Sequence, residues 1–128
     1  MEGFVNKAEV DLDAIAFNVN AFKRHVGERV EVFAVVKANA YGHGAVQVSR
    51  AALKAGATRL AVHRVSEGVE LRQAGITAPI LVMGYSPPVT VDYFVHWNLT
   101  PTLTTMEFAQ ALSARAGAGK GAIPVHVK

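Results

Sequence analysis

Residues 32–44 read VFAVVKANAYGHG, an apolar run of five residues that ends in a lysine, with two glycines close behind. A short unbroken apolar run of this kind usually lies inside a protein as a strand. Side chains alternate along a strand, so Phe33, Val35 and Lys37 share one face. The stretch therefore predicts a buried strand whose C-terminal end presents a lysine.

The same alternation of short apolar runs and helical segments continues along the chain. The apolar runs stand at Val32–Val36, Leu60–Val62, Ile80–Met83, Leu99–Leu103 and Ile123–Val127. Helices are predicted between them at Ala45–Ala55, Ser66–Ala74, Val91–Trp97 and Met106–Ala116. Strands that alternate with helices indicate a parallel sheet with crossover helices.

The N-terminal part is predicted to hold one further extended segment and one helix. The extended segment is Lys7–Leu12, and Asp13 is expected to cap a helix that runs to about Val26, with Gly27 just past its end. The apolar stripe of this helix has helical spacing and comprises Ile15, Val19, Phe22 and Val26.

The spacing of the strands favours a barrel. Successive strands start about 20 to 27 residues apart, whereas a nucleotide-binding βαβ unit needs about 30 or more. A complete (β/α)8 barrel needs about 250 residues, and the chain stops at Lys128 within an apolar run. We therefore expect an α/β fold in which residues 1–128 form the N-terminal portion of an incomplete (β/α)8 TIM-type barrel. The alternative is an open α/β sheet that ends on an edge strand.

Composition restricts the class of protein. Of 128 residues, 51% are apolar and 18% are charged, enough for a packed core. The absence of cysteine excludes disulfides and thiolate nucleophiles. No apolar stretch approaches the roughly 18 residues of a membrane helix, and the N-terminus lacks the apolar block of a signal peptide. We expect a cytoplasmic protein with no membrane partner.

Charge and histidine spacing point away from nucleic acids and metals. The net charge is only +3, and no aromatic residues interleave with the densest basic cluster, Lys23-Arg24-His25, which excludes a nucleic-acid surface. The five histidines show no metal-binding spacing such as HExxH, so no metal site is predicted.

The lysine at the end of the first strand is the candidate for chemistry. Barrel enzymes place their reactive groups at the C-terminal ends of the strands, where Lys37, His63, Met83 and Lys128 are expected. Burial favours the neutral form of an amine, and a neutral amine is a nucleophile that forms an imine with an aldehyde. The alternative is a lysine that reaches out to solvent.

The loop after Lys37 favours a reactive amine over a lysine that reaches out to solvent. Tyr41 offers a hydroxyl near the same mouth, and Gly42 and Gly44 permit close approach of the backbone to a ligand. The helix that begins near Ala45 is expected to direct free N–H groups there, which suits an anion. An amine beside an anion site suits a phosphorylated aldehyde, of which pyridoxal phosphate is the common one.

The segment AVVKANAYGHG closely resembles the cofactor-lysine motif of alanine racemases, and VDLDAI, GATRLAVHRVSEGVELRQAGI and PILVMG are also similar to that family. The resemblance covers nearly the whole chain. It implies an isomerase that uses pyridoxal phosphate to interconvert L-alanine and D-alanine, which supplies D-alanine for peptidoglycan. Members are homodimers with a barrel and a C-terminal β-domain.

The resemblance also implies individual roles. Lys37 would bind the cofactor and act as base on one face of the substrate, and Tyr41 would hydrogen-bond the phosphate. Val35 and Met83 would pack near the pyridine ring. Lys128 matches a lysine that several members carry in carbamylated form. The second base would be a tyrosine from the partner's C-terminal domain, so residues 1–128 alone are expected to be inactive.

Two other functions remain open at this level. One is a racemase of broader amino-acid specificity, and the other is a non-catalytic barrel that binds pyridoxal phosphate for its homeostasis. Continuation of the gene into a C-terminal β-domain would separate the enzyme from the non-catalytic protein.

Overall fold

The structure is a computed structural model that describes residues 7–118 and 121–128. Within these ranges five parallel strands form one sheet in the order of the chain. The strands are β1 (Phe33–Val35), β2 (Arg59–Val62), β3 (Ile80–Val82), β4 (Thr100–Leu103) and β5 (His126–Val127). The helices are α1 (Leu12–Val26), α2 (Lys37–Tyr41), α3 (Ala45–Lys54), α4 (Val65–Gln73), α5 (Val91–His96) and α6 (Met106–Gly117), with a short 3-10 turn η1 (Pro88–Thr90).

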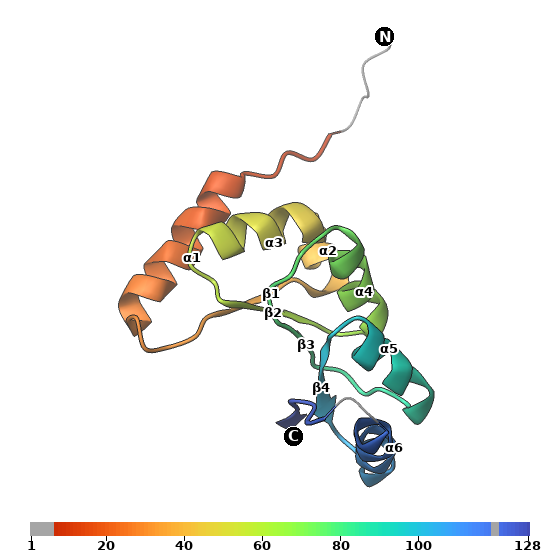
Figure 1. Cartoon of the computed structure of the whole chain (residues 1–128). Helices are drawn as coiled ribbons and strands as arrows, with labels where there is room; N and C mark the ends of the chain where they lie inside the picture. The colour runs from red at the N-terminus through yellow and green to blue at the C-terminus, as the bar shows by residue number, and fades with distance from the viewer. Residues whose placement is uncertain (1–6, 119–120) are drawn as a thin grey trace.

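The strand order identifies the architecture. An open doubly wound sheet reverses its strand order at a switch point, whereas here each new strand is added next to the previous one. Figure 1 shows the helices following one another around the outer side of a curved sheet. The chain therefore forms five strands of a TIM-type (β/α)8 barrel, and the open-sheet alternative is wrong.

The main core lies between the sheet and its helices. Leu60, Val62, Ile80 and Val82 alternate along β2 and β3 and are completely buried on the helix side. Burial of one such side chain stabilises the fold by about 1.5–3 kcal/mol. The other face of the sheet carries the inward positions of the barrel, where Val35 keeps 39% of its surface exposed.

A pair of aromatic side chains joins the last two helices to this core. Phe94 of α5 and Phe108 of α6 are both buried, and their ring centroids lie 5.5 Å apart in an edge-to-face arrangement. Such pairs stabilise a fold by about 0.5–1.5 kcal/mol beyond the contribution of the area that they bury.

The N-terminal predictions need two corrections. Residues 7–11 form no strand, because no described strand lies alongside them to pair with their backbone. The cap of α1 is Asp11 and not Asp13: the Asp11 side chain accepts hydrogen bonds from the amides of Asp13 and Ala14, both at 3.0 Å. Gly27 ends the helix as predicted. Phe22, which was predicted to belong to the apolar stripe of this helix, is 66% exposed and therefore lies outside the core.

Helices α3, α4, α5 and α6 start and end within one residue of their predicted positions, whereas α2 (Lys37–Tyr41) lies where a loop was expected. None of the helices in the described ranges has the length and the apolar composition that crossing a membrane requires.

Candidate active site

Lys37 follows β1 after one intervening residue, Val36, at the C-terminal edge of the sheet. The preceding residue, Val36, is 1% exposed and packs into the core on the helix side, while Lys37 itself is half-buried. The Lys37 Nζ atom is 5.9 Å from the centroid of the Tyr41 ring. A primary amine and a phenol therefore lie side by side at the end of the first strand, where a barrel enzyme holds its reactive groups.

The segment between these two side chains is a left-handed turn. Ala38, Asn39, Ala40 and Tyr41 have φ values of 51°, 55°, 52° and 56°, and Gly42 continues in the same region. A residue with a Cβ atom loses roughly 1–2 kcal/mol in this conformation. Strained backbone of this kind is concentrated at functional sites and persists where surrounding contacts hold it.

Hydrogen bonds within the turn hold it in place. The Ala40 amide donates to the Val36 carbonyl at 2.9 Å, and the His43 amide donates to the Ala40 carbonyl at 3.1 Å. The His43 ring also donates from Nδ1 to the Ala40 carbonyl, at 2.8 Å. The histidine of the motif therefore orders the turn.

Asn39 changes one expectation about the helix that follows. Its Oδ1 accepts a hydrogen bond from the Ala45 amide at 2.8 Å, while Gly44, the residue at the N-cap position of α3, has no side chain to do so. The sequence suggested that the Ala45 amide is free to bind an anion, but in the structure Asn39 occupies it. Asparagine also tolerates positive φ better than most residues with a Cβ, so Asn39 serves both the turn and the helix.

Glu67 of α4 ties the turn to the next strand. Its Oε1 accepts from the Ala38 amide at 2.7 Å, and its Oε2 accepts from the amides of His63 and Arg64, both at 2.8 Å. Partial burial raises the pKa of this carboxyl, but the hydrogen bonds from Arg64, Ala38 and His63 outweigh it and leave the pKa below its ordinary value. The carboxylate is therefore ionised at neutral pH.

The remaining predicted residues follow the ends of neighbouring strands. Met83 is half-buried directly after β3, and its amide donates to the Val62 carbonyl at 2.8 Å. Lys128 follows β5, is exposed, and donates from its amide to the Leu103 carbonyl at 3.2 Å. Their backbones are thus placed at the same edge of the sheet as Lys37.

The ends of β2 and β3 approach each other closely. The Gly84 amide donates to the His63 carbonyl at 3.0 Å, and a Cβ atom on Gly84 would lie 2.5 Å from that oxygen. A side chain larger than hydrogen would force these two strand ends apart.

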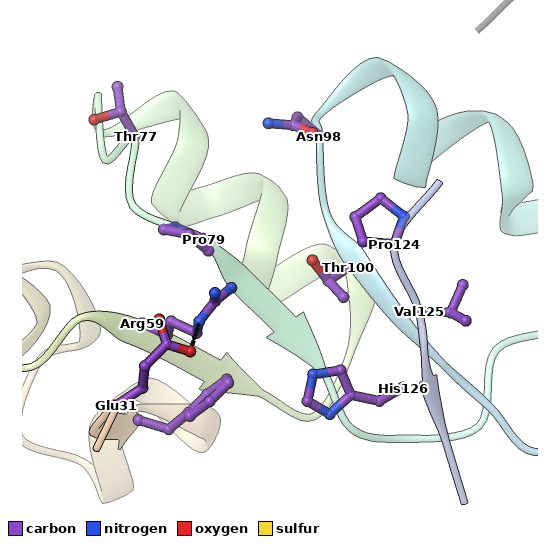
Figure 2. A pocket seen from close by; sticks show the side chains of 10 residues that line it. Glu31, Arg59, Thr77, Pro79, Asn98, Thr100, Pro124, Val125 and His126 are labelled. Atoms are coloured by element: carbon purple, nitrogen blue, oxygen red, sulfur yellow. Dashed lines mark hydrogen bonds and ion pairs between the residues drawn. The ribbon is translucent and has the colours of Figure 1, made fainter. Parts of the chain in front are cut away.

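A separate cavity lies at the opposite, N-terminal end of the strands. It holds an ion pair between Arg59 and Glu31 (Nε to Oε2, 2.6 Å) on one side and His126 on the other, as Figure 2 shows. Neither Lys37 nor Tyr41 lines it. Residues at this end of a barrel usually contribute to stability, so we assign the candidate site to the Lys37 end.

The residues present at that end fit pyridoxal phosphate. Its aldehyde requires a primary amine, which Lys37 offers, and its phosphate requires hydrogen-bond donors such as the Tyr41 hydroxyl. Val35 and Met83 supply apolar surface on strand ends beside the lysine. The donor set thus suits a phosphorylated aromatic aldehyde.

Comparison with known proteins agrees with this geometry. The family model described as alanine racemase, N-terminal domain, matches residues 10–128. Curated alanine racemases from Synechocystis sp. and Desulforamulus reducens are 46% and 48% identical, each over 94% of this chain and over 32% and 33% of their own lengths.

Solved structures give the same result. Alanine racemases from Clostridium difficile and E. faecalis superpose with TM-scores of 0.85 and 0.83, at 39% and 36% identity, over 91% and 92% of this chain and 31% and 32% of theirs. A solved alanine racemase from Bacillus anthracis with bound L-Ala-P superposes with a TM-score of 0.77 at 43% identity, over 92% of this chain and 30% of its own. The chain spans about a third of the length of these relatives. It therefore belongs to the alanine racemase family, within the N-terminal domain.

Proposed function

We propose that the protein containing this chain is a pyridoxal phosphate-dependent racemase that interconverts L-alanine and D-alanine, the latter a component of peptidoglycan. The observation that carries the proposal is the pairing of the Lys37 amine with the Tyr41 ring, 5.9 Å from Nζ to centroid, on a strained turn at the C-terminal end of β1. Membership in the alanine racemase family supports the substrate.

Lys37 has two tasks in this proposal. It would hold the cofactor through its Nζ atom, and the same Nζ would take the α-proton from one face of the alanine. When bound, pyridoxal phosphate supplies the electron sink that makes this proton removable.

The other predicted residues bind and orient. Tyr41 would donate a hydrogen bond from its hydroxyl group to the phosphate, while Val35 and Met83 would contact the apolar faces of the ring. Lys128 is proposed as the lysine that several family members carry in carbamylated form; its main-chain bond to Leu103 at the edge of the sheet is compatible with that role.

Racemisation also requires a second group that returns a proton to the opposite face. The family resemblance places it on a tyrosine of the partner subunit's C-terminal domain, so we propose a cytoplasmic homodimer whose other domains lie outside these 128 residues. Residues 1–128 on their own would then bind cofactor poorly and would not racemise alanine.

The test uses the natural full-length gene product supplied with pyridoxal phosphate. Conversion of L-alanine to D-alanine is followed with a D-amino acid oxidase assay in the wild-type protein, in Lys37→Ala and in Lys54→Ala, a matched change at the exposed last residue of α3. We expect activity in the wild type and the Lys54 variant and none in the Lys37 variant. Cofactor bound at Lys37 without any racemisation would contradict the proposal and favour the non-catalytic barrel.

A further inference from the structure

One carboxylate connects the candidate site to the neighbouring strand. Glu67 is the third residue of α4, and all three of its hydrogen-bond donors are backbone amides. Its Oε2 faces the end of β2, where His63 and Arg64 donate, and its Oε1 faces the residue that follows Lys37. The Ala38–Glu67 contact joins residues 29 positions apart in the chain.

The Ala38–Glu67 hydrogen bond differs from the other side-chain hydrogen bonds of the turn because its partner lies outside the motif. Among the described residues, the other side-chain hydrogen bonds of residues 38–44 stay within the motif and the start of α3, as those of Asn39 and His43 do. The turn's own backbone bonds also run between residues 36 and 48. The Val36 amide, just before the turn, donates to the Ala61 carbonyl of β2 at 2.9 Å, and Glu67 is the hydrogen-bonding partner from outside the motif for the described residues 38–44.

The strength of the contact follows from its charge. A backbone amide that donates to an ionised carboxylate makes a bond about twice as strong as a neutral pair. It acts on the peptide group that joins Lys37 to Ala38, the first residue of the turn with positive φ. Movement of this peptide would swing the Lys37 Cα atom, and the amine lies at the end of a long flexible side chain that magnifies any such change.

We propose that Glu67 is a positioning residue for Lys37: by holding the Ala38 amide, its Oε1 sets the direction from which the lysine presents its amine to pyridoxal phosphate. The inference rests on the proposed function of Lys37. It extends that proposal to a residue on another helix that touches neither the amine nor the cofactor.

Glu67→Gln tests the tether selectively. Glutamine has one acceptor oxygen, and we expect it to keep that oxygen on the two amides of His63 and Arg64, since this retains two bonds. Its NH2 group then faces the Ala38 amide, and two donors oppose each other. The cap of α4 survives while the contact to the turn is lost. Glu70→Gln is the matched control, because Glu70 lies one turn further along the same helix and is exposed.

The first measurement is amide hydrogen exchange in the full-length protein without cofactor, followed by mass spectrometry of peptides that cover residues 37–45. We expect exchange at Ala38 to become about tenfold faster in Glu67→Gln and to stay unchanged in Glu70→Gln. Equal exchange in the two variants would overturn the tether.

The second measurement is the dissociation constant of pyridoxal phosphate, obtained by titration at a temperature where circular dichroism shows every variant folded. We expect a rise of about tenfold in Glu67→Gln relative to Glu70→Gln. A purely structural role would lower the unfolding midpoint and leave this constant unchanged, and that result would overturn the inference. If Glu67→Gln does not fold, Glu67→Asp replaces it, because its carboxylate is one methylene too short to reach both sides; the same rise is expected and its absence carries the same meaning.

The wild-type protein separates this inference from the proposal beneath it. Suppose that Lys37 captures the cofactor in the wild type and that both glutamine variants have the same dissociation constant. This result would refute the positioning role of Glu67 and leave the proposed function intact. Capture at a different lysine in the wild type would refute the proposed function, and the inference would fall with it.

Discussion

Asn39 offers a direct test of how the left-handed turn is stabilised. Three variants separate its two roles. Asn39→Ala removes the Oδ1 acceptor for the Ala45 amide, 2.8 Å away, and also places a residue with poor tolerance for positive φ at φ 55°. Asn39→Gly removes the acceptor but accepts this φ. Asn39→Asp keeps an acceptor oxygen and much of the tolerance.

The structure sets the expected sizes. A lost helix cap costs about 1 kcal/mol, and alanine in the left-handed region adds roughly 1 kcal/mol more. We therefore expect losses of about 2 kcal/mol for Asn39→Ala, about 1 kcal/mol for Asn39→Gly and less than about 0.5 kcal/mol for Asn39→Asp. The glycine value includes a small entropic cost from the unfolded chain.

Amide hydrogen exchange of the first turn of α3 measures these values locally. The free energy of opening at Ala45 and Val48 should fall in the order Asp, Gly, Ala. Equal opening free energies in Asn39→Ala and Asn39→Asp would refute the cap, and equal values in Asn39→Ala and Asn39→Gly would refute the contribution of the left-handed backbone.

Three other predictions concern single side chains. Arg72 donates four hydrogen bonds of 2.7–2.9 Å to four carbonyl oxygens in two loops, so Arg72→Ala should lower the free energy of unfolding, measured by urea denaturation, by about 3 kcal/mol. The control Arg50→Ala loses one exposed hydrogen bond and should lower it by less than about 1 kcal/mol. Similar losses in the two variants would contradict this prediction. Tyr41→Phe should raise the dissociation constant of pyridoxal phosphate about tenfold, and an unchanged constant in the same titration would exclude a phosphate contact. The pKa of Glu67 lies below its ordinary value of 4.5 in the folded protein, so the unfolded chain binds this proton more tightly than the folded chain does. The contribution of the Glu67 carboxylate to stability should therefore be fully present above about pH 4.5 and be lost as the pH falls through the folded pKa. Thermal melts should show a smaller loss of stability at low pH in Glu67→Gln than in the wild type.

Much of the fold could be predicted because its signals are local. The apolar runs at Leu60–Val62 and Ile80–Met83 mark strands that the helices cover, and Gly27 marks a helix end through its freedom at positive φ. The segment Lys7–Leu12 was predicted wrongly for the opposite reason. A strand depends on a partner, and alternation of side chains carries no information about whether one lies alongside.

The site could be predicted only in part. The sequence draws attention to Lys37 and Tyr41 because the lysine ends an apolar run and the tyrosine follows it by four residues; their roles stay predictions. The left-handed conformation of residues 38–41 was missed, since two alanines and a tyrosine are unusual there. Glu67 carries no signal in the sequence beyond its place in the predicted helix Ser66–Ala74, because its contact with Ala38 depends on tertiary folding that brings distant segments together.

The central claim is that the Lys37 amine captures the aldehyde of pyridoxal phosphate. The most direct test is borohydride reduction of the full-length protein loaded with the cofactor, followed by peptide mass analysis of every lysine. We expect a pyridoxyl group on Lys37. A pyridoxyl group on any other lysine, or on none, would contradict it.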